Sequence, residues 1–218
     1  MLIRTIFTIL VVMTSSFMTL PLFSQEIKTT TFYVVRHGQT DWNIQKKMQG
    51  HVDIPLNETG RAEAASLAVE LKDIPFSMCF SSDLQRASET ASIITAMSSL
   101  PLKTDKRLRE RDFGPWEGCL HSEYTSNDGK QEGVESNEAM QERIFQILEQ
   151  AADQYMGSDI LIVTHSGVIR QLIIQTLGLD HSISVAIKNT AVLKLTYANN
   201  QWVVTDLQGI TLPIEAPL

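Results

Sequence analysis

The chain has few cysteines and no long block of like charge, and each shortage excludes a class of protein. Only two cysteines, Cys79 and Cys119, occur in 218 residues, too few for a disulfide framework. They either form one disulfide or pack as unpaired thiols. The formal net charge of −7 comes without a basic stripe, which argues against nucleic-acid binding. No repeat of roughly 20 to 50 residues is present, which argues against a solenoid or propeller.

The sequence also lacks the signatures of a metal site. There is no H-E-x-x-H motif and no closely spaced pair of cysteines. His51, His121 and His181 do not have the spacing of metal ligands. We therefore expect no metal and no cofactor, and we expect these three histidines to have no catalytic role.

The N-terminus differs in composition from the rest of the chain. One positive charge, Arg4, precedes an uncharged and mostly apolar stretch that is interrupted by Pro21 and ends near Ser24. This pattern indicates a signal peptide over residues 1–24, although an uncleaved membrane anchor fits the length nearly as well. We expect an exported protein, periplasmic or secreted, that contacts a membrane only if this segment is retained.

Residues 30–212 are predicted to form a single α/β domain. Short apolar runs at 31–35, 76–80 and 159–164 are typical of strands in a parallel sheet whose two faces are covered. Residues 191–197 and 202–207 flank the sequence ANNQ and indicate an antiparallel hairpin.

Helical patterns lie between these strands. They begin after Thr59, at Ser82, at Ser136 and after His165, and the last of them ends at Gly178. Ser82 and Gln85 have the spacing of a capping box. The sum predicts a three-layer fold with a mainly parallel central sheet, one antiparallel edge and helices on both faces.

Basic side chains gather at the predicted ends of the strands. Arg36 and His37 follow the first strand, and His165 follows the strand over 159–164. The carboxyl ends of parallel strands border the ligand crevice, so the two histidines should meet there, and Arg86 can lean in from the next helix. Helix N-termini add free N–H groups that favour an anion. The pattern predicts a phosphate pocket, in which Gly38 would let the backbone approach the ligand.

Six motifs carry a resemblance to a known family. They are RHGQTDWN (36–43), MQGHVDIPLNETGR (48–61), SSDLQRASETA (81–91), LRERDFGPWEG (108–118), GVES (133–136) and THSGVIR (164–170). In these motifs and their order the sequence resembles the histidine phosphatase superfamily, on the phosphatase branch of the phosphoglycerate mutase-like proteins. The similarity covers essentially everything after residue 30.

The resemblance implies an activity and a set of site residues. It implies that His37 is a nucleophile that forms a phosphohistidine, with Glu110 as general acid and then general base. Arg36, Arg86 and His165 would complete the catalytic set. Phosphate or substrate contacts are further implied for Gly38, Asn43, Gln49, Gly50 and Ser166. From the residues alone, Glu110 could instead belong to a solvated charged face over 106–112.

The implied function is metal-independent hydrolysis of a small phosphorylated metabolite. Phosphoglycerate mutase activity, or an inactive member that binds a phosphorylated ligand, are the alternatives. The cofactor-dependent mutases that the sequence resembles have a long basic insertion between the acid and the second histidine, whereas here Glu110 and His165 are only 55 positions apart.

Residues 119–135 are expected to form a loop over the pocket mouth, and charges are counted between Phe113 and Ser136. The only basic residue of this stretch is Lys130, and its acidic residues are Glu117, Glu123, Asp128, Glu132 and Glu135. We expect such a mouth to repel a second phosphate or carboxylate, which favours a phosphatase over a mutase. The sequence leaves the natural substrate and the oligomeric state open.

Overall fold

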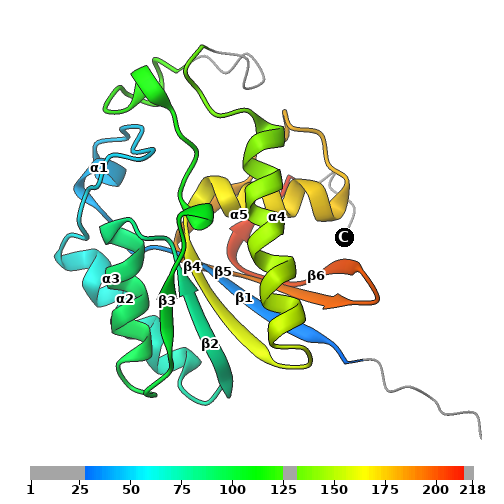
Figure 1. The fold of residues 1–218 in the computed structure, drawn as a ribbon. Helices are drawn as coiled ribbons and strands as arrows, with labels where there is room; N and C mark the ends of the chain where they lie inside the picture. Colours follow the sequence, from blue (N-terminus) through cyan, green and yellow to red (C-terminus); the bar gives the residue numbers. More distant parts are fainter. Residues whose placement is uncertain (1–27, 125–131, 214–218) are drawn as a thin grey trace, which may run out of the picture.

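A six-stranded sheet forms the centre of the molecule (Figure 1). The structure is a computed structural model and describes residues 28–124 and 132–213, so the predicted signal segment lies outside the described residues. In spatial order β3-β2-β4-β1-β5-β6, the strands are β3 (Leu102–Thr104), β2 (Phe76–Ser81), β4 (Asp159–Thr164), β1 (Thr30–Arg36), β5 (Ala186–Ala198) and β6 (Gln201–Thr211). The first four are mutually parallel, and β5 and β6 form the predicted antiparallel hairpin at one edge.

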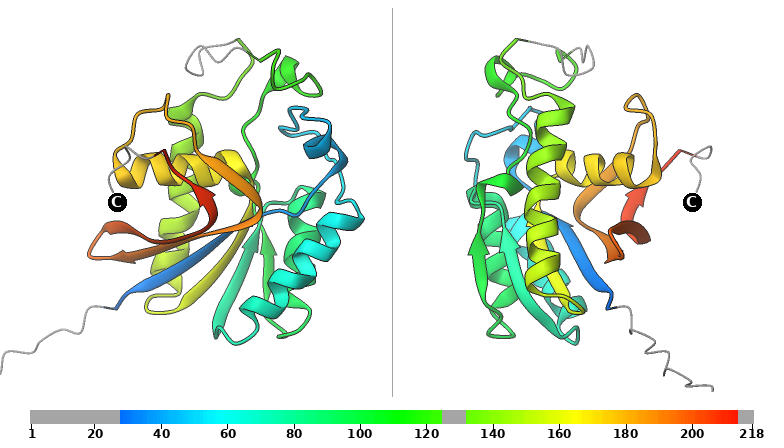
Figure 2. Two further views of the ribbon diagram at one scale, coloured as in Figure 1. Left: turned by 180° about the vertical axis from the view of Figure 1, so that it is seen from behind. Right: turned by 45° about the vertical axis from the view of Figure 1, so that its right-hand side comes forward.

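Helices cover both faces of the sheet, as predicted (Figures 1 and 2). They are α1 (Asp41–Ile44), α2 (Glu58–Leu71), α3 (Gln85–Thr95), α4 (Asn137–Gln154) and α5 (Ser166–Leu177), with short 3-10 turns η1 (Lys106–Leu108) and η2 (Gly114–Trp116). Within the described ranges, no helix is both long and apolar enough to cross a membrane.

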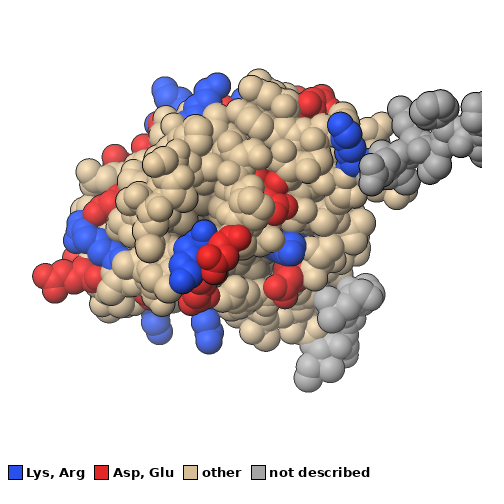
Figure 3. Space-filling view, turned by 90° about the horizontal axis from the view of Figure 1, so that it is seen from below, with Lys and Arg blue, Asp and Glu red and all other residues tan. Residues whose placement is uncertain are grey.

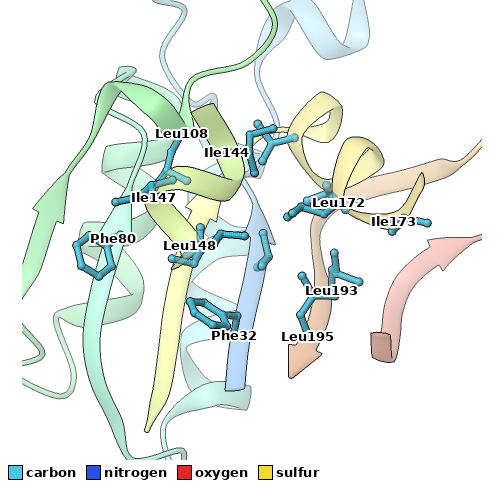
Figure 4. Close-up of a cluster of buried hydrophobic side chains, with 14 of the residues drawn as sticks. Phe32, Phe80, Leu108, Ile144, Ile147, Leu148, Leu172, Ile173, Leu193 and Leu195 are labelled. Atoms are coloured by element: carbon cyan, nitrogen blue, oxygen red, sulfur yellow. The ribbon is translucent and has the colours of Figure 1, made fainter. Parts of the chain in front are cut away.

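The alternation of side chains along β1 divides the core into two parts. Phe32 and Val34 face the layer of α4 and α5, where they pack with residues such as Leu148 and Leu172 (Figure 4). Val35 faces the opposite layer of α2 and α3. Both faces of the central strands β1 and β4 are therefore covered, which explains why these two strands are continuous apolar runs rather than alternating ones.

One local prediction was wrong, and one short strand was missed. The helix α3 begins at Gln85 with Leu84 at its N-cap, so Ser82 is not part of a capping box. The backbone N–H of Ser82 instead donates to Val163 at 2.9 Å and continues the pairing of β2 with β4. The short strand β3 was not predicted, because its three side chains are all exposed and carry no apolar pattern.

The structure decides between the two states considered for the cysteines. Cys79 is buried and Cys119 is partly exposed, and both are free thiols. Burial raises the pKa of the Cys79 thiol to about 12, so it packs as a small apolar side chain.

Surface charge is mixed where the molecule is seen from below. Basic and acidic side chains are interspersed on this face among broad uncharged areas (Figure 3). Cationic groups with little exposure, such as Arg86, gather instead at the carboxyl end of the parallel strands.

Candidate active site

A pocket of about 390 Å³ lies at the carboxyl ends of β1 and β4. It brings together predicted residues from distant parts of the chain. Those that line it are Arg36, His37, Asn43, Gln49, Arg86, Glu110 and Ser166. The first strand and the N-termini of α3 and α5 meet here because the parallel strands end at one edge of the sheet.

His37 is held as a neutral imidazole with a defined tautomer. Its ring Nδ1 lies 2.7 Å from the carbonyl oxygen of Gly38, which can only accept, so Nδ1 carries the proton and Nε2 does not. Burial, followed by the charges of Arg86 and Arg36, holds the pKa of His37 well below its usual range. The lone pair on Nε2 is therefore available at neutral pH for attack on an electrophile.

His165 packs against His37 and is fully buried. The two ring centroids are 5.2 Å apart, and His165 occupies the N-cap position of α5. Neither of its ring nitrogens has a hydrogen-bond partner among the described residues. Burial, followed by the charge of Arg86, holds its pKa well below the usual range. A buried imidazole without a partner is costly, which is consistent with a ligand-binding role.

Backbone carbonyls orient the two arginines of the pocket. Arg36 donates from Nη1 to Ile187 at 2.6 Å, and Arg86 donates to Val52 at 2.9 Å and to Gly50 at 2.7 Å. The Nε atoms of both side chains are buried without a partner among the described residues. Burial lowers the pKa of Arg86 to about 10, so the group stays charged at neutral pH. Two fixed guanidinium groups with unused donors suit a phosphate.

Glu110 belongs to the pocket and not to a solvated charged face. It is 7% exposed, and its Oε2 accepts hydrogen bonds from the backbone of Gly167 at 3.0 Å and from the hydroxyl of Ser166 at 3.3 Å. Its backbone carbonyl accepts from His51 at 2.9 Å and from Arg143 at 3.0 Å. The carboxyl group is therefore fixed at the N-terminus of α5, within the pocket that His37 lines.

Asn43 and Gln49 both line the pocket, and their predicted contacts with phosphate stay a prediction. The side-chain oxygen of Asn43 accepts from the backbone of Thr40 at 3.0 Å and from Asn189 at 3.2 Å, which leaves its amide nitrogen as the free donor. The side chain of Gln49 is nearly buried, and its oxygen has no partner among the described residues.

Three predicted residues do not line the pocket directly. His165 packs beside His37, and the carbonyl of Gly50 accepts a hydrogen bond from Arg86. The structure shows a close packing contact for Gly38, and its expected approach to the ligand stays a prediction. A Cβ atom on Gly38 would lie 2.3 Å from the carbonyl oxygen of Gly60 in α2, and one on Gly60 would lie 2.1 Å from the carbonyl oxygen of Gln39.

Sequence reasoning missed several residues of the site. His51 and His121 were expected to have no role, yet His51 supports Glu110 and His121 lines the pocket. Lys47 and Arg170 also line it. A spacing search for metal ligands does not detect such residues. The available signals were the position of His51 two residues after Gln49 and of Arg170 one helical turn after Ser166.

The described acidic residues of the expected mouth are engaged with other parts of the chain or lie outside the pocket lining. Glu117 accepts from the backbone of His51 at 2.7 Å, Glu135 pairs with Arg143 at 2.6 Å, and Glu123 accepts from the backbone of Leu120 at 2.8 Å. None of these carboxylates lines the pocket. Lys130 and Asp128 lie outside the described residues. A count of charges along residues 113–136 does not describe the pocket, because most of the residues that line the pocket come from other segments of the chain.

The chain is similar to known proteins over most of its length. The family model of the histidine phosphatase superfamily (branch 1) matches residues 32–209. Phosphoglycerate mutase-like protein 4 of Arabidopsis thaliana is 38% identical over 165 residues, covering 68% of this chain and 72% of the relative. The uncharacterized phosphatase PhoE of Bacillus subtilis is 33% identical over 180 residues, covering 81% and 93%.

A solved structure shares the fold. A mutant phosphoserine phosphatase from Entamoeba histolytica, in complex with phosphoserine, has a TM-score of 0.72 and 26% identity, covering 82% of this chain and 96% of that one. The motifs, the fold and the extent of the family match agree, and the chain belongs to the histidine phosphatase superfamily, whose members include phosphatases and mutases.

Proposed function

We propose that the protein is a phosphomonoester hydrolase that acts through a phosphohistidine at His37. The observation that carries the proposal is the tautomer of His37, whose Nδ1 donates to Gly38 and whose Nε2 is left unprotonated. Arg36 and Arg86 flank the same pocket with unused donors, and Glu110 supplies a carboxyl group within it. The presence of the complete set favours an enzyme over an inactive phosphate-binding member.

In the first step, Nε2 of His37 attacks phosphorus and the bond from phosphorus to the ester oxygen breaks. Glu110 in its protonated form gives its proton to the departing alkoxide. The arginines neutralise the charge on the equatorial phosphate oxygens, and the neutral ring of His165 can donate a hydrogen bond to one of them.

In the second step, the Glu110 carboxylate takes a proton from water as the water oxygen attacks the phosphohistidine. The N–P bond breaks, and inorganic phosphate and a neutral His37 are released. Glu110 is protonated again and can act on the next substrate, so one group serves as acid and then as base.

Hydrolysis is expected to exceed phosphoglycerate mutase activity. The reason is the short interval from Glu110 to His165, 55 positions of which α4 takes 18, which leaves little chain to close over a phosphohistidine and exclude water. The enzyme is supplied with 3-phosphoglycerate and 2,3-bisphosphoglycerate while 2-phosphoglycerate and free phosphate are followed together. Isomer formation much faster than phosphate release would assign a mutase.

Activity is expected to be unaffected by metal chelation. Arg36 and Arg86 can supply the charge that magnesium provides in many phosphoryl-transfer enzymes. Within the described residues, no group of three or more histidine, cysteine or acidic side chains could hold a metal ion. Hydrolysis is measured after EDTA treatment, with and without added divalent ions. Loss on chelation with recovery on adding an ion would contradict the prediction.

The predicted export signal remains a separate proposal. If residues 1–24 are removed, the native protein begins near Gln25 and is found outside the cytoplasm. The intact mass of protein purified from its source, together with cell fractionation, checks this. A mass that includes Met1 would point to a retained anchor or to a protein that is not exported.

A further inference from the structure

We propose that His51 is a positioning residue for the general acid. Its imidazole ring, together with Arg143, holds the backbone carbonyl of Glu110 and thereby fixes the direction in which the Glu110 carboxyl group points. Neither His51 nor Arg143 lines the active-site pocket, so both act through Glu110. The inference rests on the proposed function, because it concerns the group that protonates the leaving alcohol.

The segment that carries Glu110 is neither a helix nor a strand. Residues 109–113 connect the 3-10 turns η1 and η2. The Glu110 carboxyl group accepts hydrogen bonds from the backbone N–H groups of Arg111 at 2.8 Å and Gly167 at 3.0 Å. Because a displacement of about 1 Å in an active site can cost on the order of 100-fold in rate, the contacts that fix the backbone of Glu110 bear on catalysis.

Two side chains donate to the carbonyl oxygen of Glu110. Nε2 of His51 lies 2.9 Å from this oxygen, and Nη2 of Arg143 lies 3.0 Å from it. A carbonyl oxygen can only accept, so Nε2 of His51 carries a proton. The oxygen has two lone pairs, and the two donors together fix the orientation of the peptide group between Glu110 and Arg111.

Arg143 anchors the same segment to the helix α4. It donates to the carbonyls of Arg107 and Arg109, each at 2.7 Å, in addition to that of Glu110. Its guanidinium group is itself held by Glu135, through contacts of 2.6 Å and 2.7 Å to the two carboxylate oxygens. Such a bidentate pair fixes the guanidinium plane. Arg143 therefore supports the whole segment, whereas His51 contacts only the residue that bears the acid.

His51 is held at its backbone and faces a carboxylate with its other ring nitrogen. Its backbone N–H donates to Glu117 at 2.7 Å, and Nδ1 of its ring lies 3.7 Å from the Asp112 carboxylate. The carbonyl of the preceding residue, Gly50, accepts from Arg86. A change of the His51 side chain alone leaves the backbone contacts of this segment in place. The effect on the general acid can therefore be separated from an effect on Arg86.

A separate cavity gives access to the His51 ring. Its volume is about 470 Å³, it is lined by both His51 and Arg143, and it shares none of its described lining residues with the active-site pocket. The side chain of His51 is 30% exposed. A small donor such as imidazole can therefore reach the position of this ring without entering the active site.

Two classes of ester test the role of His51. The variant His51→Leu keeps an apolar side chain of similar size but removes the donor. We expect kcat/KM for propyl phosphate to fall roughly 10-fold, the effect of losing one hydrogen bond. The kcat/KM for p-nitrophenyl phosphate should stay nearly unchanged, because nitrophenolate departs without needing a proton. The variant His51→Gln, whose side-chain amide can donate to the same carbonyl, should recover most of the loss.

The matched control is Lys106→Leu. Lys106 lines the same cavity but is not one of the two donors to Glu110, so this variant should leave both esters unaffected. If His51→Leu does not fold, His51→Ala is assayed with and without added imidazole. Recovery of propyl phosphate hydrolysis by imidazole supports the role, and no recovery opposes it.

A double-mutant cycle shows whether His51 acts through Glu110. In Glu110→Gln protein the acid is already lost, so adding His51→Leu should lower kcat/KM for propyl phosphate no further. Effects that multiply, a fall of equal size for the two esters, or an unchanged rate in His51→Leu would each overturn the inference and leave the hydrolase standing. If wild-type protein hydrolyses neither ester, the proposed function fails and the positioning role fails with it.

Discussion

Replacing His37 by alanine is expected to abolish phosphoenzyme formation and to lower kcat/KM for phosphomonoesters by roughly 10⁴- to 10⁶-fold. The neutral ring offers its Nε2 lone pair because Nδ1 is committed to Gly38. In the described part of the pocket, His165 is the other buried imidazole and packs against His37. Its place at the N-cap of α5 suits a hydrogen-bond donor to phosphate better than an attacking group. Loss of His37 therefore removes the attacking atom itself.

Rapid quenching with a substrate labelled in its phosphoryl group measures this. The label on the wild-type protein should be lost in acid and kept in base, as expected for a phosphohistidine. It should map to the peptide that contains His37. The variant should carry no label although its fold, followed by circular dichroism, is retained. Labelling that persists in His37→Ala would assign the nucleophile to another residue.

Replacing Glu110 by glutamine is expected to lower kcat/KM for alkyl phosphates by roughly 10²- to 10⁴-fold. The kcat/KM for p-nitrophenyl phosphate should fall much less, because nitrophenolate departs without needing a proton. The second step still needs a base, so phosphoenzyme should accumulate and produce a burst of nitrophenol. The amide keeps the size of the side chain that Gly167 and Ser166 contact but cannot give or take the proton.

Steady-state and burst kinetics with the two classes of ester check this prediction. Glu142→Gln is the matched control, since Glu142 lies exposed on α4 and does not line the pocket. A fall of equal size for alkyl and nitrophenyl esters would show that Glu110 does not protonate the leaving group. A smaller loss for alkyl esters than for nitrophenyl esters would contradict the role more strongly.

The long elements of the fold could be predicted because each has a strong apolar pattern. Buried runs such as 159–164 identified the parallel strands, and the turn with Asn199 and Asn200, both at positive φ, closed the predicted hairpin. The strand β3 could not be found, because it is three residues long and exposed on the sheet edge. Ser82 misled because the spacing of a capping box does not reveal that its backbone N–H continues the sheet.

The site residues at the ends of the strands were predictable, and those from a loop and from the second turn of α5 were not. Arg36 ends β1, and His37 and His165 directly follow β1 and β4, so topology alone brings them to one edge. Arg111 and Arg170 come from a loop and from the second turn of α5, and only the folded chain shows that they face one cavity. Glu135, which looked like part of an acidic mouth, is paired with Arg143 and supports the segment of Glu110.

The contact between Gly38 and Gly60 restricts how the sequence can change. A side chain at either position would strike a main-chain oxygen, that of Gly60 in one direction and that of Gln39 in the other. Main-chain atoms are present whatever residue occupies a position, so no substitution elsewhere can remove the obstacle. Each glycine must therefore be kept independently of the other, and a damaging change at one of them can be repaired only by reversion or by moving the backbone. The loop that follows His37 and the helix α2 must therefore keep the same close approach whatever changes elsewhere in the sequence.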